Sequence, residues 1–222
     1  MTASASRRRF DLVVFDLDGT LVTHDGPVWR TLHGRLGSDP TRRREVVRQA
    51  LAGQISYAEW FAADLAMLRA AGADRTRLLA VVDDLAPALG ALSLLRALRA
   101  AGARTAVLSG GLDLVVERHL PADLLDAVHI NRVHFDAAGA IAGGEATPYD
   151  REHKADGLRA LAVRFGVAAE RVAFVGNGPN DIEAAREAAF AVAWADAPEA
   201  LRAVSDLYLP GPDLMTLAPH LL

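Results

Sequence analysis

The stretch that decides the fold lies near the start of the chain and reads Phe10-Asp11-Leu12-Val13-Val14-Phe15-Asp16-Leu17-Asp18-Gly19-Thr20. Residues 10–15 are mostly apolar or β-branched, which is typical of a strand buried on both faces of a parallel sheet. This run ends at Asp16, and a second carboxylate follows at Asp18. Ligands of an open parallel sheet bind beyond the carboxyl ends of its strands. We therefore expect these two acids to lie at a binding site.

Further strand-like segments follow later in the chain, and helical patterns separate them. They are residues 104–108, which lead into Ser109-Gly110-Gly111; residues 171–175, which lead into Gly176-Asn177-Gly178-Pro179-Asn180-Asp181; residues 190–194; and a weaker strand near 206–208. Alternation of strand and helix predicts an α/β fold with a Rossmann-like, doubly wound parallel sheet. Short apolar pieces around Gly139 and Gly143-Gly144 predict a small β-hairpin within residues 127–147.

Residues 22–86 differ from the rest, because they contain helical patterns and no strand-like run. Helices are expected at residues 28–36, 41–52, 57–71 and 75–85, separated by glycine-containing breaks. The pattern predicts a helical bundle inserted after the first strand. The expected organisation is a core domain of residues 1–21 and 87–222, with a cap domain of residues 22–86.

Composition narrows the classes of partner. The 222 residues carry a net charge of −4, are 51% hydrophobic and include no cysteine, so disulfides and thiolate metal sites are excluded. No extended basic face is visible, which argues against a nucleic-acid partner. No apolar stretch approaches the roughly 18 residues needed to span a bilayer, so we expect no membrane partner and a cytoplasmic location. The oligomeric state is not predicted.

The single lysine of the chain, Lys154, stands out, because the other basic residues among the 24 are all arginine. A position that keeps lysine in such a composition is a candidate for a site that requires a compact ammonium group. A chance surface lysine is the alternative that composition alone leaves open.

The polar residues at the strand ends suit phosphoryl transfer. Asp16 and Asp18 can hold a hard divalent cation, which takes oxygen ligands. The Ser109 hydroxyl and the amides that follow it suit phosphate oxygens, and a lysine adds a point charge against the same group. In this chemistry Asp16 is the candidate covalent nucleophile and Asp18 the candidate proton shuttle.

Four motifs in order resemble those of the haloacid dehalogenase-like phosphohydrolase superfamily. Asp16-Leu17-Asp18-Gly19-Thr20-Leu21 resembles the first motif, Ser109 the second, Lys154 the third, and residues 176–181 the fourth. The helical insert and the expected hairpin resemble the phosphoserine phosphatase-like branch. The resemblance extends over nearly the whole chain.

The resemblance implies a role for each matching residue. Asp16 would attack phosphorus, while Asp18 would protonate the leaving oxygen and then activate water. Ser109, Gly110 and Lys154 would hold the phosphoryl group. Mg²⁺ would be bound by Asp16, the backbone carbonyl of Asp18, Asn177 and Asp181, and Asn180 would order the metal's waters.

Two departures from the family pattern affect the metal site and the substrate. Asn177 stands where most relatives have a metal-binding aspartate, so we expect weaker Mg²⁺ affinity. Asp25 replaces the glutamate that would grip a serine amine, and Asp64 replaces the arginine that would hold its carboxylate. Both replacements argue against phosphoserine. Asp25, Tyr57, Trp60 and Asp64 are candidates for a specificity patch, with ordinary cap packing and surface charge as the alternative.

The sequence therefore predicts a Mg²⁺-dependent phosphatase that hydrolyses a small phosphorylated metabolite through an aspartyl-phosphate. A phosphotransferase that passes the phosphoryl group to an alcohol acceptor would have the same metal site. A non-catalytic binding or regulatory protein is a further alternative, suggested by Asn177 alone. The tryptophans, Trp29 among them, are expected in the core rather than at a ligand.

Overall fold

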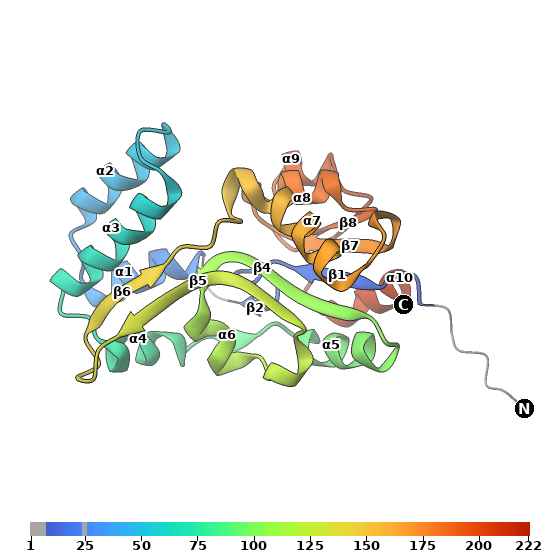
Figure 1. The fold of residues 1–222 in the computed structure, drawn as a ribbon, viewed down its shortest axis with the longest axis horizontal. Helices are drawn as coiled ribbons and strands as arrows, with labels where there is room; N and C mark the ends of the chain where they lie inside the picture. The colour runs from blue at the N-terminus through green and yellow to red at the C-terminus, as the bar shows by residue number, and fades with distance from the viewer. Residues whose placement is uncertain (1–7, 24–25) are drawn as a thin grey trace, which may run out of the picture.

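The computed structural model describes residues 8–23 and 26–222, and a seven-stranded sheet runs through its centre (Figure 1). The strands lie in the order β6-β5-β4-β1-β7-β8-β9. Their bounds are β1 Leu12–Phe15, β4 Arg104–Leu112, β5 Ala127–Phe135, β6 Ile141–Glu145, β7 Val172–Gly176, β8 Phe190–Trp194 and β9 Leu207–Leu209. All neighbours in this sheet pair in parallel except β5 and β6. The predicted α/β fold is confirmed.

Strand β1 lies at the centre of the sheet, between β4 and β7, and its side chains are buried on both faces. Val13 and Phe15 belong to the core on one face, and Leu12 and Val14 to the core on the other. This two-sided burial explains why the strand is continuously apolar rather than alternating with polar residues.

Helices cover both faces of the sheet (Figure 1). On one face lie α7 (Lys154–Phe165), α8 (Ile182–Glu187) and α9 (Glu199–Arg202), and on the other lie α5 (Ala91–Ala100), α6 (Asp113–His119) and α10 (Ala218–Leu221). Short 3₁₀ turns complete the core: η1 Ala122–Leu124, η2 Arg151–His153, η3 Ala169–Arg171, η4 Pro179–Asp181 and η5 Leu214–Leu217.

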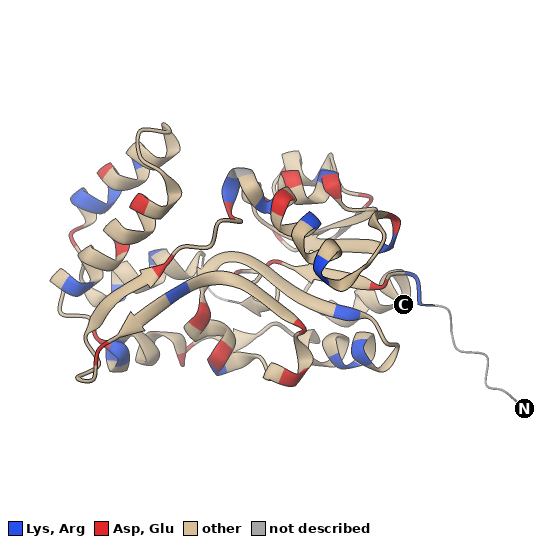
Figure 2. Ribbon diagram, viewed as in Figure 1, with Lys and Arg blue, Asp and Glu red and all other residues tan. Residues whose placement is uncertain are grey.

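Residues of both charge signs are interspersed over the elements (Figure 2). No helix in the described ranges is long and apolar enough to cross a membrane.

Four helices lie within residues 28–82, where the sequence predicts them: α1 Val28–Leu36, α2 Pro40–Leu51, α3 Tyr57–Ala70 and α4 Arg75–Val82. Local sequence sets their ends. The left-handed Gly37 ends α1, the Asp39 carboxylate accepts amide hydrogen bonds at the start of α2, and a Ser56–Glu59 capping box starts α3. An antiparallel pair of two-residue strands, β2 (Val22–Thr23) and β3 (Ala86–Pro87), joins this segment to the core.

The predicted hairpin is formed by β5 and β6, and helix α3 packs against it. A side chain at Gly144 would come within 2.4 Å of the Arg132 carbonyl oxygen and 2.8 Å of the Phe61 ring. Glycine is therefore required where α3 crosses the hairpin. Because α3 contacts β6 and α4 contacts α6, the helices of residues 28–82 rest on the core. Their division into a separate cap domain stays a prediction.

Candidate active site

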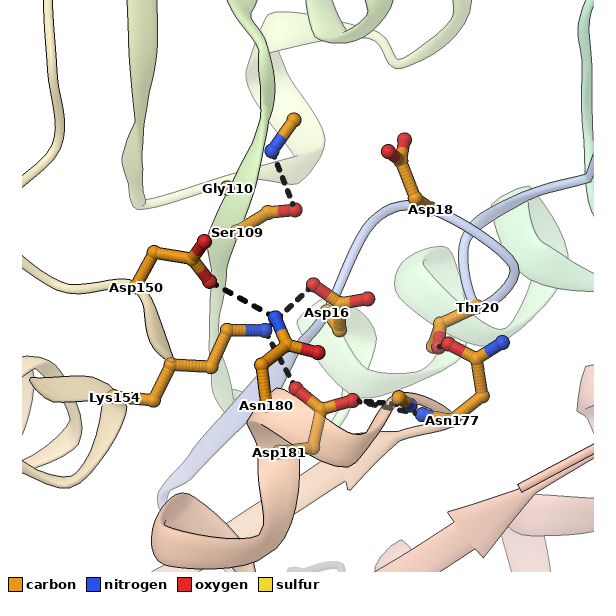
Figure 3. Close-up of polar contacts among 12 residues, drawn as sticks. Asp16, Asp18, Thr20, Ser109, Gly110, Asp150, Lys154, Asn177, Asn180 and Asp181 are labelled. Carbon is orange, nitrogen blue, oxygen red and sulfur yellow. Dashed lines mark hydrogen bonds and ion pairs between the residues drawn. The ribbon is translucent and has the colours of Figure 1, made fainter. Parts of the chain in front are cut away.

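The structure brings together residues that the sequence separates by up to 165 positions (Figure 3). Asp16 follows β1, Lys154 opens α7, and Asp181 closes the η4 turn after β7. Ser109 lies within β4, which continues to Leu112 through a register shift rather than ending at residue 108 as predicted. The irregular strand end turns the backbone around Ser109 towards the same place.

Three charged side chains form the floor of the site. Lys154 Nζ donates to Asp16 Oδ1 at 2.8 Å and to Asp181 Oδ1 at 2.5 Å, and none of the three residues is more than 4% exposed. Complete burial excludes a chance surface lysine. Two carboxylates and one ammonium out of water are stable only when paired in this way.

Burial and neighbouring charges shift the pKa values of Asp16 and Lys154. Desolvation raises the pKa of Asp16 to about 7; the Lys154 charge opposes this shift, and the charges of Asp181 and Asp18 add to it. Burial by itself lowers the pKa of Lys154, but the nearby carboxylates, Asp16 first, outweigh it and raise that pKa overall. Lys154 is therefore a permanent cation, whereas ionisation of Asp16 depends on the positive charge around it.

Both carboxylate oxygens of Asp181 already have donors. Oδ1 accepts from Lys154, while Oδ2 accepts from the amides of Asn177 at 2.9 Å and Gly178 at 2.7 Å. This geometry suits a residue that holds Lys154 and the loop after β7 in place. Direct metal binding by Asp181 stays a prediction.

Asn177, whose amide donates to Asp181, uses its side chain to fix the loop after β1. Its Oδ1 accepts from Thr20 Oγ1 at 3.2 Å, and a side chain at Gly19 would come within 2.2 Å of its Nδ2. The same Nδ2 donates to Asp196 Oδ1 at 3.2 Å. Sequence analysis missed Asp196, although it lies two residues beyond β8 and the strand-end rule applied to β8 would have found it.

Asp18 and Asp150 face the cavity from opposite sides. Asp18 Oδ2 accepts from the amide of Val28, the first residue of α1. Asp150 Oδ1 accepts from Asn180 Nδ2 at 2.9 Å, and its Oδ2 lies 2.2 Å from where a side chain on Gly110 would begin. Sequence analysis also missed Asp150, four positions before Lys154, because it looks like an ordinary turn residue.

A cavity of about 590 Å³, which we call the core-side cavity, opens over this floor. Its lining includes Asp16, Asp18, Ser109, Gly110, Gly111, Asn177, Asn180 and Asp196. Within residues 8–23 and 26–222 no three His, Cys, Asp or Glu side chains are grouped to hold a metal ion alone. Mg²⁺ does not need such a group, since it commonly takes one or two carboxylates and completes its shell with other oxygens. The mixed carboxylate, carbonyl and amide oxygens here fit that requirement.

Two cap residues reach the core at one carbonyl group. Trp29 Nε1 donates to the Gly110 carbonyl oxygen at 2.9 Å, and the Tyr57 hydroxyl donates to it at 3.5 Å. Asn131 Nδ2 donates to that carbonyl oxygen at 2.8 Å and to the Tyr57 hydroxyl at 2.7 Å. Burial raises the pKa of Tyr57, so the hydroxyl stays protonated and able to donate. Trp29 packs against the core as expected, but it also lines the cavity.

The other specificity candidates lie on α3 or outside the described residues. Asp64 is only 3% exposed, so it is not an ordinary surface charge, and its Oδ1 lies 2.9 Å from His33 Nε2. Trp60 is partly buried and packs edge-on to Tyr57 at 6.3 Å between ring centres. Asp25 lies outside the residues that the structure describes.

Comparisons with known proteins identify the family of the chain. A family model described as haloacid dehalogenase-like hydrolase matches residues 10–189. The chain is 35% identical over 211 residues to phosphoserine phosphatase SerB2 of Mycobacterium tuberculosis, covering 93% of this chain and 49% of that protein. It is 31% identical over 209 residues to a phosphoserine phosphatase of Idiomarina loihiensis, covering 93% of this chain and 91% of that protein.

A solved structure agrees at the level of the fold. It is described as a phospho-aspartyl intermediate analogue of phosphoserine phosphatase, and it matches with a TM-score of 0.76 at 22% identity over 96% of this chain and 100% of that one. The chain thus spans about half of the mycobacterial relative and nearly all of the Idiomarina one. It belongs to the haloacid dehalogenase-like hydrolase family, in the phosphoserine phosphatase-like branch, and that family identifies it as a phosphatase enzyme.

Proposed function

We propose that this protein is a Mg²⁺-dependent phosphatase that hydrolyses a phosphomonoester through a covalent aspartyl-phosphate on Asp16. The observation that carries the proposal is the buried Asp16–Lys154–Asp181 cluster next to a cavity that Asp16, Ser109 and Gly110 line. Such a cluster places a carboxylate nucleophile beside fixed positive charge, and phosphoryl transfer depends mainly on positioning and charge neutralisation.

In the first step a carboxylate oxygen of Asp16 attacks phosphorus, and the bond from phosphorus to the ester oxygen breaks. The departing alkoxide takes a proton from Asp18 and leaves as the product alcohol. Lys154, the Ser109 hydroxyl and the Gly110 amide hold the phosphoryl oxygens as their charge is redistributed. In the second step Asp18 removes a proton from water, the water oxygen attacks phosphorus, and Asp16 is released with inorganic phosphate.

The metal would be held by Asp16, the backbone carbonyl of Asp18 and Asn177, all of which line the core-side cavity. When bound, Mg²⁺ supplies positive charge that neutralises the phosphoryl oxygens. Asp181 orients Lys154 and the loop of residues 177 and 178 through its two oxygens. In this proposal Asp181 acts through these neighbours. Asn180 positions Asp150, whose Oδ1 accepts from Asn180 Nδ2.

Hydrolysis of an aryl phosphate in the presence of Mg²⁺ tests the proposal directly. We expect turnover by the wild type and a loss of at least about 10³-fold in kcat for Asp16→Asn, because the amide cannot form the covalent intermediate. Mass spectrometry of quenched wild-type enzyme should find phosphate on Asp16. Equal activity in the two proteins would remove Asp16 from the mechanism.

Two alternatives make different predictions in the same assay. A phosphotransferase would release more alcohol than inorganic phosphate when an acceptor alcohol is added, whereas a hydrolase releases the two in equal amounts. A non-catalytic binding protein would turn over none of a panel of phosphoesters. The floor around Asp16 would serve a hydrolase and a phosphotransferase alike, and we favour the hydrolase because the matching family model is a hydrolase and the relatives above are named phosphatases.

A further inference from the structure

A second cavity of about 630 Å³, the cap-side cavity, adjoins the core-side cavity on the side of the helical insert. Pro27, Trp29, Gly110, Asp150, Pro179 and Asn180 line both cavities. The two cavities are therefore neighbours, and Asp16 lines the core-side one. A phosphomonoester bound over Asp16 would direct its alcohol portion into the cap-side cavity.

Four aromatic side chains line the cap-side cavity. Trp29 meets Phe61 edge-on at 5.7 Å between ring centres, and Tyr57 meets Trp60 edge-on at 6.3 Å; all four residues line the cavity. These pairs hold the rings in fixed orientations. A space of this volume suits a ring-sized group, since cavities of about 300–1,000 Å³ typically enclose drug-sized ligands. The side chain of serine is far smaller and would leave most of the aromatic wall uncovered.

Polar atoms of the wall are incompletely satisfied. In the part of the chain that the structure describes, Trp60 Nε1 and Asp64 Oδ1 are buried and have no hydrogen-bond partner. His33 Nε2 lies 2.9 Å from Asp64 Oδ1, within ion-pair distance, so of these two wall atoms Trp60 Nε1 is the one that has neither a hydrogen bond nor an ion pair. Buried polar atoms nearly always have partners, so atoms without them at a cavity wall indicate a ligand.

Charge at the wall discriminates among ligands. Asp64 is the carboxylate of the cap helices in this lining, and it sits on the same helix face as Trp60 and Phe61. The lining holds three acidic residues, Asp64, Asp150 and Glu183, against two arginines, Arg151 and Arg186, so it favours an amine on the ligand over a carboxylate. Arg151, which also lines the cavity, has its guanidinium over the Trp60 ring at 5.7 Å.

Building on the phosphatase function proposed above, we propose that the cap-side cavity binds the alcohol portion of the substrate. That portion has an aromatic body, carries an amine or hydroxyl that donates to Asp64, and has no carboxylate. The Trp29, Tyr57, Trp60 and Phe61 rings enclose the body. This substrate class differs from phosphoserine, which is small and carries a carboxylate.

Pairs of substrates with matched leaving groups test this inference. 2-Phenylethyl phosphate and ethyl phosphate differ in the ring alone, and we expect kcat/KM to be about 10- to 100-fold higher for the former because the ring is buried. Tyramine O-phosphate and O-phosphotyrosine differ in the carboxylate alone, and we expect the former to be preferred by about 10-fold or more. Ratios near one in both pairs would overturn the inference while leaving the phosphatase function intact.

Cap variants assign these preferences to residues. Trp60→Ala should lower the 2-phenylethyl to ethyl ratio about 10-fold, whereas Trp60→Phe, which keeps a ring, should preserve most of it. Asp64→Asn, which keeps the shape and removes the charge, should bring O-phosphotyrosine to within about threefold of tyramine O-phosphate. Unchanged ratios in Trp60→Ala and Asp64→Asn would contradict the assignment.

Binding of a product alcohol gives a readout that does not depend on catalysis. Trp29 and Trp60 line the cavity, so tyramine should change the tryptophan fluorescence of the wild type, with weaker binding to Asp64→Asn. If no phosphoester is hydrolysed, the proposed function fails while this titration still tests the cavity. If phosphoesters are hydrolysed but tyramine does not bind, the cavity inference fails alone.

Discussion

The floor of the site and its cap wall differ in whether their buried polar atoms all have partners. On the floor, Lys154 has two carboxylate partners, and both oxygens of Asp181 have donors. On the cap wall, Trp60 Nε1 and Asp64 Oδ1 are buried without hydrogen-bond partners among the described residues. The floor is complete before a ligand arrives, whereas in our proposal a ligand completes the wall. The comparison indicates that the floor determines the chemistry and the wall determines the substrate.

The two regions are also held differently. Two of the floor residues, Asp16 and Asp181, follow the paired central strands β1 and β7, and the third, Lys154, opens helix α7. The cap helices join the core through two-residue strands and meet the site at the Gly110 carbonyl oxygen. A wall on this kind of attachment can be altered without disturbing the nucleophile, which is how a phosphoserine phosphatase-like fold can accept another substrate class.

The largest effect should follow from breaking the floor with Lys154→Met. Asp16 and Asp181 would then face each other without the ammonium between them, so we expect kcat to fall by about 10³-fold or more. The free energy of unfolding should fall by roughly 3–5 kcal/mol, since one partner of a buried charge cluster is lost. Steady-state kinetics and urea denaturation measure the two effects. Near-normal activity would mean that the floor does not carry the chemistry.

The two floor carboxylates should respond in opposite directions when each becomes an amide. Asp16→Asn removes the group that burial disfavours in its charged form and leaves Lys154 paired with Asp181, so the melting temperature in EDTA should rise by about 2–8 °C. Asp181→Asn turns an amide group towards Lys154 and should lower the melting temperature. A rise in both variants, or a fall in both, would contradict the proposed division of roles.

The pH dependence gives a second test of the same pair. The folded-state pKa of Asp16 is raised to about 7 from an ordinary value of 3.8, so the wild-type folded state binds more protons than the unfolded state between these values. Wild-type stability should therefore decline as pH rises from about 4 to 7. The advantage of Asp16→Asn should be small near pH 4 and complete above pH 7.

Sequence analysis was most informative about the floor. Asp16 and Asp181 follow apolar strands, so their proximity was predictable from the strand-end rule, whereas Lys154 was placed at the site by the family resemblance and was a candidate on composition alone. Their roles stay predictions. The predicted end of β4 at residue 108 was wrong. Ser109-Gly110-Gly111 resembles a turn in the sequence, but the strand continues through it to Leu112.

Sequence analysis was least informative about contacts between loops and within the cap. Asp150 and Asp196 sit in polar turns, where an acidic residue is the expected surface residue, and only the folded chain brings them to Asn180 and Asn177. The burial of Asp64 beside His33 depends on how α1 and α3 pack. Neither periodicity nor composition predicts that packing in helices with mixed polarity.

Next to the floor, Asn177→Asp should strengthen Mg²⁺ binding. A carboxylate attracts Mg²⁺ more strongly than an amide, so half-maximal activity should require about 3- to 10-fold less Mg²⁺. In EDTA the new carboxylate would face Asp196, now 3.2 Å from Asn177 Nδ2, and the melting temperature should fall. Adding Asp196→Asn should reverse that fall. An unchanged Mg²⁺ titration would show that residue 177 is not a ligand.

The smallest effect is expected at the junction of the two regions, from Tyr57→Phe. This change removes a hydroxyl that accepts from Asn131 and donates to the Gly110 carbonyl oxygen, and it keeps the ring in the cap wall. The Gly110 carbonyl oxygen still has Trp29 and Asn131 as donors, so the free energy of unfolding should fall by only about 0.5–1.5 kcal/mol.

The substrate ratios of Tyr57→Phe then separate docking of the cap from selection of the substrate. Since the ring remains, the 2-phenylethyl to ethyl ratio should stay within about twofold of the wild type, while KM for both esters rises together as cap docking weakens. A fall in the ratio itself would mean that selectivity depends on the hydrogen bond to the floor rather than on the aromatic wall. In that case the two regions could not be altered independently, because the cap would select its substrate through the Gly110 carbonyl group.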